Sequence, residues 1–413
     1  MPSITTTVLD CGMPLITEKM EGVRSVGLAW LLPGGTARDP RDRQGLSTLL
    51  AEVVQRGAGG LDSRAHADAC DKFGMSRGVG NEAQFISVTA TMLGSRLLDG
   101  LPLIVDMVRR PRLDPADFEP ARDLAVQAIE SLKDDPQERV MHLLRKRHNP
   151  DPINRSSLGT IEGLNALTAG DLAPGWARAA VPGGAILGVA GDVDAAALAK
   201  RLNELLTGWA GASSPVTWTG EGERGAVHEK DDTNQVHIAL CHDAPSEKEP
   251  SCWLERAATA VLSGGMSGRL FTEVREKRGL CYSVYASYAA DARYGRTVAY
   301  SGTTPERAQE TLNVLLGELR RVRTEAGAIE DAELKRALVG LKSKLVMSGE
   351  SSGARAAALV RDYHKIGRAR SLDEVAAEFD RVTLDAVNRH LRSTPMGRLT
   401  VATIGPAELS VPA

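Results

Sequence analysis

The amino-acid sequence predicts an α+β protein of two similar domains, each a mostly antiparallel sheet with helices packed on one face. Three observations support this fold class. The length of 413 residues suits more than one domain. Strand and helix patterns recur in the same order in both halves. Residues 206–225 are rich in Gly, Ser, Thr and Pro without a hydrophobic period, which is typical of a linker. We therefore predict an N-terminal domain at 1–210 and a C-terminal domain at 226–413.

The internal repeat is the strongest of these observations. Residues 85–108 and 295–319 each contain an alternating strand, a turn, and a helix with apolar residues three and four positions apart. Long helical patterns follow at 117–135 and 331–349, and each half closes with a charged turn, a helix and a strand. Any α+β chain alternates strands with helices, but four elements that match in order favour duplication of one domain.

The bulk composition argues against several classes of partner. Charged residues make up 25% of the chain with a net charge of −3, so no basic field attracts nucleic acid. Aromatic residues, at 4%, leave few surfaces for base stacking. The first residues lack the pattern of a secretory signal, and no apolar run is long enough to span a membrane. The five cysteines are an odd number without close pairs, which predicts reduced thiols and a cytoplasmic protein.

The segment 45–57, GLSTLLAEVVQRG, has the period of an amphipathic helix. Its apolar positions predict a stripe that faces the core, formed by Leu46, Leu49, Leu50, Val53 and Val54. Gly57 suits the position after the last turn, where a positive φ is common. The opposite face presents Thr48, Ala51, Glu52 and Gln55.

This helix resembles the zinc-binding helix of the pitrilysin/insulinase peptidases, the inverzincins, whose motif is H-x-x-E-H. In that motif two histidines four residues apart bind zinc, and the glutamate between them is the general base. The resemblance places the two histidine positions at Thr48 and Glu52 and the base position at Ala51. The scaffold of the helix is thus similar, whereas the ligands are not.

The family's third zinc ligand is a glutamate on a later helix, before an acidic turn. It corresponds to Ala128, and a shift in register would place Gln127 or Glu130 there instead. Threonine and alanine do not hold zinc in such a site, and one glutamate cannot form a three-ligand centre. His66 and Cys70, four apart on a predicted helix, could share a metal, although a solvated histidine and a packed cysteine are the commoner explanation. We predict that this chain alone is not a zinc peptidase and carries no cofactor.

The segment 262–288, LSGGMSGRLFTEVREKRGLCYSVYASY, resembles the zinc-less half of the same family. A glycine-rich loop enters a helix, and Gly279 is placed to end that helix. The apolar side of the helix is predicted to comprise Leu270, Phe271 and Val274. The strand that follows alternates, which predicts one shared face for Leu280, Tyr282, Val284, Ala286 and Tyr288.

Arg275 and Tyr282 lie seven residues apart across this helix–turn–strand corner. The resemblance implies that the pair reaches a zinc site in another half and stabilises the negative charge that develops on the scissile carbonyl oxygen. Arginine offers a permanently charged fork of donors, and tyrosine offers an O–H on a stiff ring. Two structural explanations compete: Glu273 and Lys277 could simply pair on a solvated helix, and Tyr282 could be a half-buried strand aromatic.

Two further segments are candidates for substrate binding. The glycine-rich loop lacks the lysine of a phosphate loop, so nucleotide binding is not expected. The resemblance to the zinc-less alpha subunit of mitochondrial processing peptidase implies that Gly264, Gly265 and Gly268 contact substrate. The resemblance also implies an edge strand within 78–90 to which a peptide adds as another strand, an edge that could be idle in a domain without zinc.

Taken together, the resemblance implies the zinc-less subunit of a heterodimeric metalloendopeptidase, one half of a clamshell that encloses a peptide. Its partner would be a homologous chain with H-x-x-E-H that holds the zinc, and this chain would supply Arg275 and Tyr282 to that site. One alternative is a non-catalytic peptide-binding or scaffold protein of the same fold, and another is a homodimeric enzyme with an unrecognised metal site. Neither nucleic acid nor membrane is expected as a partner. The spacing of the Arg/Tyr pair favours the first hypothesis, because a scaffold has no chemical reason to carry it.

Overall fold

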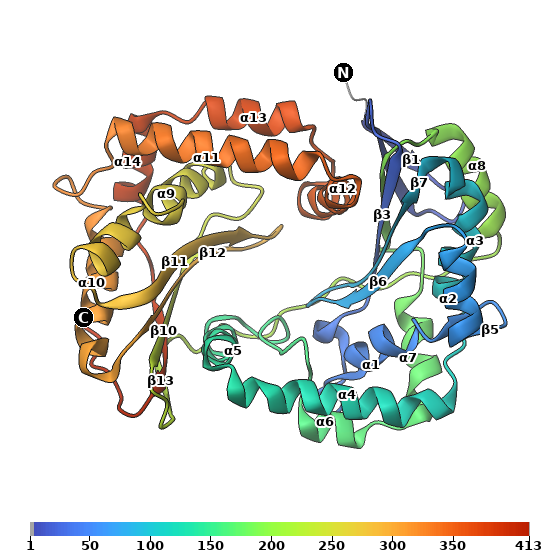
Figure 1. Cartoon of the computed structure of the whole chain (residues 1–413), viewed down its shortest axis with the longest axis horizontal. Helices are drawn as coiled ribbons and strands as arrows, with labels where there is room; N and C mark the ends of the chain where they lie inside the picture. Colours follow the sequence, from blue (N-terminus) through green and yellow to red (C-terminus); the bar gives the residue numbers. More distant parts are fainter. Residues whose placement is uncertain (1–3, 413) are drawn as a thin grey trace. The chain divides into compact units, whose positions relative to one another are not determined.

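The computed structural model describes residues 4–412 and contains two compact units, each discontinuous in sequence (Figure 1). The first unit comprises the chain up to Ser131 together with Asp151–Gly220 and Ser348–Ser371. The second unit comprises Leu132–Pro150, Glu221–Met347 and the chain from Leu372 onward. Each unit therefore contains its own sheet and one segment from the other half of the sequence.

The first unit is built on a six-stranded sheet of order β1-β2-β8-β3-β7-β6. All neighbours are antiparallel except β2 and β8, which are parallel. The strands span Ile4–Val8 (β1), Pro14–Lys19 (β2), Ser25–Leu32 (β3), Ser76–Asn81 (β6), Ile86–Leu93 (β7) and Ile186–Gly191 (β8), while Gly57–Ala58 (β4) and Leu61–Asp62 (β5) pair separately. Strand β6 ends the sheet, so within residues 4–412 one of its edges has no neighbouring strand.

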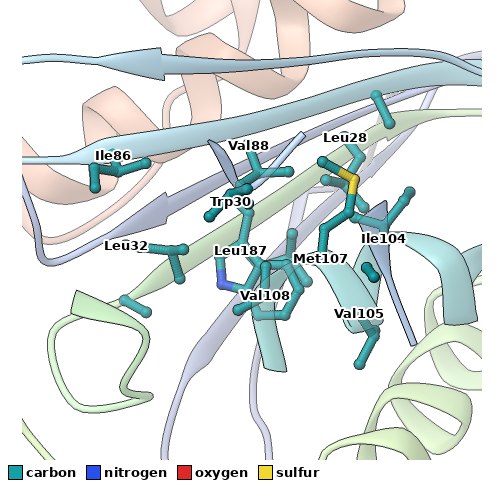
Figure 2. Packing of buried hydrophobic residues seen from close by; sticks show 14 of the residues in the cluster. Leu28, Trp30, Leu32, Ile86, Val88, Ile104, Val105, Met107, Val108 and Leu187 are labelled. Atoms are coloured by element: carbon teal, nitrogen blue, oxygen red, sulfur yellow. The ribbon is translucent and has the colours of Figure 1, made fainter. Parts of the chain in front are cut away.

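Helices cover one face of this sheet and enclose the larger core. They span Leu46–Val53 (α1), Ser63–Asp71 (α2), Leu97–Arg109 (α3), Phe118–Ser131 (α4), Ile161–Ala166 (α6), Leu172–Ala179 (α7) and Ala195–Leu205 (α8). Trp30 of β3 is fully buried at the centre of this core, with Val108 of α3 and Leu187 of β8 close by (Figure 2). The Trp30 indole N–H lies 3.1 Å from the sulfur of Met13, so its one polar group is not left unsatisfied.

The opposite face of the sheet is also apolar, and a helix from the second half of the sequence covers it. This helix, α12 (Ser352–Ile366), packs Leu359 and Val360 against strand residues that include Ile16 and Leu31. At its start, the backbone of α12 approaches β3 so closely that a Cβ on Gly27 would lie 2.4 Å from the backbone nitrogen of Gly353. A sheet with two apolar faces needs cover on both sides, and α12 supplies the second side.

The second unit repeats the arrangement with a five-stranded sheet of order β11-β12-β10-β13-β9. Its strands span Gly225–Lys230 (β9), Val236–Ala244 (β10), Cys281–Ala290 (β11), Gly295–Thr303 (β12) and Thr400–Gly405 (β13), and the pair of β13 with β9 is parallel whereas the others are antiparallel. The helices that the C-terminal half of the sequence contributes to this unit span Cys252–Ser263 (α9), Ala308–Arg321 (α10), Asp331–Gly349 (α11), Leu372–Asp380 (α13) and Leu384–Ser393 (α14). The predicted α+β class with mostly antiparallel sheets is confirmed.

Helix α5 (Pro136–His148) is the counterpart of α12 and covers the second face of this second sheet. Its Val140 and Leu144 pack against sheet residues such as Cys241 and Tyr300. Each unit thus includes one helix from the other half of the sequence, α12 in the first unit and α5 in the second. The contiguous segments 1–210 and 226–413 do not contain this exchange. No helix within residues 4–412 is long and apolar enough to cross a membrane.

Candidate functional site

Helix α1 forms where the apolar spacing of residues 45–57 predicts it. Gly45 precedes it with a φ of 117°, and the buried carboxylate of Asp39 accepts hydrogen bonds from the Gly45 and Ser47 backbone N–H groups at 2.9 and 3.0 Å. Burial raises the pKa of Asp39, and these hydrogen bonds, with the Ser47 hydroxyl, oppose the rise. The predicted stripe from Leu46 to Val54 is buried, so the orientation of the helix is fixed by its core face.

The four positions that correspond to the zinc site line a single cavity in the first unit. The cavity has a volume of about 330 Å³. Its lining comprises Thr48, Ala51, Glu52 and Gln55 beside α1, Val79 and Asn81 of β6, Ala121, Leu124, Ala125 and Ala128 of α4, and Ser157 and Leu158 of a loop. Helical spacing accounts for the set, because three- and four-residue steps along α1 and α4 turn these side chains toward each other.

Polar groups at one end of the cavity hydrogen-bond to one another, but among residues 4–412 the buried side-chain oxygen of Asn81 has no partner. The Thr48 hydroxyl donates to the backbone carbonyl of Ser157 at 2.9 Å. The Asn81 side-chain amide donates to the Thr48 hydroxyl at 3.1 Å and to the same carbonyl at 2.9 Å. The place of the first zinc-binding histidine is therefore taken by a hydrogen-bonded network of neutral groups.

Glu52, at the second histidine position, is the one charged group that lines the cavity. Arg56 holds its carboxylate at 2.9 Å and also reaches Asp117 at 3.5 Å. Within residues 4–412 no group of three or more His, Cys, Asp and Glu side chains is arranged to hold a metal ion. Because Thr48 is engaged and Ala51 and Ala128 have no ligand atoms, the residues of this cavity do not fit zinc.

His66 and Cys70 are both buried on α2 rather than one being solvated. Their Nδ1 and Sγ atoms are 3.9 Å apart, and His66 Nε2 lies 3.4 Å from the Leu103 carbonyl oxygen. Burial lowers the pKa of His66 and raises that of Cys70, so both are neutral at pH 7. The pair belongs to the packed core.

The second candidate site is the corner that carries Arg275 and Tyr282. Residues Phe271–Glu276 form a short π-helix, in which the Lys277 N–H bonds the Thr272 carbonyl five residues earlier at 3.0 Å. Such turns are rare and frequently mark functional sites. Leu270 and Val274 are buried, as the apolar pattern predicts, whereas Phe271 is only half-buried. Gly279, with a φ of 61°, ends the turn in a conformation that favours glycine.

A bulge at the start of β11 places the tyrosine. Cys281 pairs with Thr303 and Ser283 with the adjacent Gly302, so Tyr282 is the extra residue between them. The predicted alternation, which put Tyr282 on the face of Ala286, is wrong at this point because the bulge changes the direction of the side chain. Tyr282 is 81% exposed, which argues against its being a half-buried strand aromatic.

Arg275 lies between two aromatic rings. Its guanidinium carbon is 4.9 Å from the ring centre of Phe271 and 4.9 Å from that of Tyr282. Glu273 instead pairs with Lys277 at 2.7 Å and Arg278 at 2.8 Å. Hydrogen bonds from these two cations lower the pKa of Glu273. Among residues 4–412 Arg275 has no carboxylate partner, so its donors are available although the neighbouring charges are paired.

The glycine-rich loop connects α9 to this corner. Gly264 and Gly265 are exposed, while Gly268 is buried, and a Cβ there would lie 2.8 Å from the Leu262 carbonyl oxygen. Gly264 and Gly268 border a small cavity of about 50 Å³ against α11. Gly268 thus has a packing role, and the two exposed glycines remain candidates for substrate contact.

The sequence reasoning missed a buried polar network in the second unit. Glu255 of α9 lies 3.0 Å from His390 Nε2 and accepts a hydrogen bond from the Thr297 hydroxyl at 2.7 Å. Burial alone would raise the Glu255 pKa, but these bonds and the nearby His242 and Arg323 outweigh burial and lower it to about 2. A glutamate within the apolar run of α9 is the only sequence signal for this network.

Residues 168–341 match the family model described as Peptidase M16 inactive domain. A Mycobacterium tuberculosis protein named an uncharacterized zinc protease is 26% identical over 407 residues, covering 97% of this chain and 92% of that protein. Bacillus subtilis YmxG, also named an uncharacterized zinc protease, is 24% identical over 405 residues, covering 96% of this chain and 97% of that protein.

Solved structures show the same fold. The crystal structure of a peptidase M16 inactive domain from Pseudomonas fluorescens matches with a TM-score of 0.86 at 18% identity, covering 98% of each chain. A protease from Helicobacter pylori gives a TM-score of 0.86 at 17% identity, covering 98% of this chain and 100% of that chain. These comparisons confirm the predicted resemblance to the pitrilysin/insulinase, or M16, family.

Proposed function

Because this chain resembles the M16 peptidases over nearly its whole length and matches their inactive-domain family, we propose that it is the zinc-less subunit of a heterodimeric metallopeptidase. The proposal depends on one observation, the exposed Arg275–Tyr282 pair. The partner is a homologous chain with H-x-x-E-H that holds the zinc, and the substrate is a peptide. The cavity at Thr48 and Ala51 does not fit a metal, so the catalytic metal belongs to the partner.

The chemistry of the pair suits amide hydrolysis. Attack on the scissile carbonyl carbon moves negative charge onto the carbonyl oxygen, and hydrogen-bond donors placed there lower the barrier. An arginine side chain offers a charged fork of donors, and among residues 4–412 Arg275 has no competing carboxylate. Tyr282 supplies a second donor, and its ring also limits the positions that the guanidinium can adopt. We assign substrate contact to the exposed glycines of the adjoining loop, Gly264 and Gly265, while the buried Gly268 packs the base of that loop.

A reconstituted complex tests the assignment. The chain is co-expressed and co-purified with a candidate partner, a similar-sized homologue that carries H-x-x-E-H, and cleavage of a quenched fluorescent peptide is followed. Arg275→Ala should lower kcat by about 10²–10³, and Tyr282→Phe should lower it less, because only the hydroxyl is lost. Arg278→Ala is the matched control, since Arg278 is on the same surface but pairs with Glu273.

A different outcome would favour the second candidate, a non-catalytic peptide-binding protein. Turnover that is the same for wild type, Arg275→Ala and Tyr282→Phe would remove the catalytic role of the pair. The cavity beside the free edge of β6 is the observation that keeps peptide binding as the alternative. Stoichiometric zinc in the purified lone chain would instead support a homodimeric metalloenzyme.

A further inference from the structure

Helix α11 carries two cations that no other side chain neutralises. Arg336 and Lys344 are both exposed, and among residues 4–412 neither side chain forms a hydrogen bond or an ion pair. Lys335 of the same helix is engaged, because it pairs with Asp331 at 2.7 Å. The chain as a whole has a net charge of −3, so the two cations are a local feature rather than part of a general basic surface.

Both cations line the small cavity between α11 and the glycine-rich loop that follows α9. The apolar part of its lining comprises Ala260 and Val261 of α9 and Ala337 and Leu341 of α11. Ser267 of the loop adds a hydroxyl group. The volume of about 50 Å³ is too small for a whole ligand, for which roughly 300–1,000 Å³ is usual, so the cavity suits a single functional group.

Glu333, a carboxylate that also lines this cavity, does not cancel the two positive charges. Arg269 donates from Nε to one of its oxygens at 2.7 Å, and the Glu330 backbone N–H donates to the other at 2.8 Å. Burial alone would raise the Glu333 pKa, but these hydrogen bonds outweigh burial and lower it. Glu333 therefore has its own counter-charge in Arg269, and the charge that remains at the cavity is positive.

Gly340 lies midway between the two cations and has no packing reason to be a glycine. It is in the interior of α11, where glycine is a poor helix former. Apart from the backbone of the helix itself, no atom lies within 4 Å of the position that its Cβ would take. Residues four apart on a helix share a face, so Arg336 and Lys344 flank this open space with about 6 Å of helix on either side. A side chain at position 340 would fill space that the cavity leaves open between the two charges.

From these observations we propose that the cavity over Gly340 binds a carboxylate group of a peptide between Arg336 and Lys344. A guanidinium and an ammonium group both donate charge-assisted hydrogen bonds to a carboxylate, and the Ser267 hydroxyl is a neutral donor beside them. The apolar lining suits the carbon atoms that carry the carboxylate. The C-terminus of a peptide and an Asp or Glu side chain offer this same chemistry.

The inference deepens the proposed function by giving the class of substrate, peptides with an acidic group, and it rests on that function in taking the ligand to be a peptide. Gly264, to which substrate contact is assigned, lines the same cavity as the two cations. A peptide that contacts the glycine-rich loop would therefore lie next to Arg336 and Lys344.

The test uses the purified full-length chain without a partner. Short peptides of one neutral sequence carry an uncharged dye at the N-terminus, and their binding is followed by fluorescence anisotropy. The reference peptide is amidated. The second has a free C-terminal carboxylate, the third is amidated with a central Glu, and the fourth is amidated with a central Lys.

At least one of the two acidic peptides should bind about 10-fold more tightly than the reference, the gain expected for charge-assisted hydrogen bonds to partly exposed cations. The comparison between these two peptides identifies whether a terminal or a side-chain carboxylate is preferred. The lysine peptide should bind no better than the reference.

Charge variants locate the preference at the cavity. The double variant Arg336→Gln/Lys344→Gln should fold, because both positions are exposed, and should bind the acidic peptides no better than the reference. Lys335→Gln is the matched control, since it removes the same charge from an exposed position of the same helix that does not line the cavity. It should leave the preference for the acidic peptides unchanged.

Variants at Gly340 test the open space itself. Gly340→Ala should raise the thermal midpoint, because alanine is the better helix former and its Cβ would meet no atom within 4 Å. Gly340→Leu should fill the space between the two cations and remove the preference for the acidic peptides. A lower midpoint for Gly340→Ala, or an undiminished preference in Gly340→Leu, would count against the site.

Several results would overturn the inference. These are no measurable peptide binding, equal affinities for the acidic and reference peptides, tighter binding of the lysine peptide, a preference that survives the double variant, or one that Lys335→Gln removes as well. None of them would affect the catalytic proposal, because this assay contains no partner and the proposal is judged by turnover of the reconstituted complex. Conversely, full turnover of the Arg275→Ala complex together with a preference for acidic peptides would remove the catalytic role and retain the carboxylate site.

Discussion

Removal of the Arg355 guanidinium should destabilise the first unit strongly, although this residue lies in the second half of the sequence. Arg355 on α12 is 3% exposed and pairs with Glu18 of β2, which is 2% exposed. Arg355 also donates to the Arg370 carbonyl. Arg355→Met keeps most of the apolar volume but leaves the Glu18 carboxylate buried without its counter-charge.

Loss of one partner of a buried pair typically costs about 3–5 kcal/mol. This is a large fraction of the roughly 5–15 kcal/mol that stabilises a typical protein. With a urea slope of about 1–3 kcal/mol per molar, the unfolding midpoint should fall by at least 1 M. Urea unfolding followed by tryptophan fluorescence measures it, since Trp30, Trp176, Trp209 and Trp218 all lie in the first unit.

The same helix supplies the control. Arg361 pairs with Glu82 at 3.1 Å, but their side chains are 58% and 41% exposed. Arg361→Met should therefore cost no more than about 1 kcal/mol. The double variant Glu18→Gln/Arg355→Met should recover part of the loss, because no charge then remains buried. If Arg355→Met were no more harmful than Arg361→Met, α12 would not be an integral part of the first unit and the reasoning would be refuted.

Three further results are expected. Restoring the family's three ligands with Thr48→His, Glu52→His and Ala128→Glu, and its general base with Ala51→Glu, should make the chain bind about one zinc ion, measured by metal analysis after dialysis. A variant that folds but binds no zinc would contradict the convergence of these positions on one cavity. Gly27→Ala should lower the thermal midpoint, with a cost of about 1–3 kcal/mol, because its Cβ would lie 2.4 Å from the Gly353 nitrogen; an unchanged midpoint would mean that α12 can shift away. The pKa of Glu255 is about 2 in the folded protein, so its ionised carboxylate stabilises the fold at pH values above the ordinary carboxyl pKa near 4.5. This stabilisation is lost as the pH falls toward 2. Glu255→Gln should therefore cost roughly 3 kcal/mol in urea unfolding at pH 7, and a difference that did not shrink between pH 5 and pH 2.5 would count against the network.

Much of the fold and of the site followed from local pattern. Apolar spacing predicted the helix at 45–57 and its buried stripe, and the repeat predicted equivalent strands and helices in each half. The replacement of the zinc ligands was also evident, because a threonine or an alanine lacks ligand chemistry whatever its surroundings. The sequence also placed Arg275 and Tyr282 on either side of one corner.

Only the tertiary structure determined the features that depend on strand pairing and on which helix covers which face of a sheet. The bulge that exposes Tyr282 arises from its register against β12, which its own strand pattern does not encode. The exchange of α5 and α12 between the units follows from the need to cover the second apolar face of each sheet. The sequence did not predict this exchange, because an amphipathic helix pattern does not specify which of the two sheets the helix covers. The sequence by itself therefore determined that this chain resembles zinc peptidases of the M16 family but lacks their metal ligands. Only the packing of α4, α1 and β6 determined that a cavity lies at the former ligand positions, because its walls come from segments far apart in the chain.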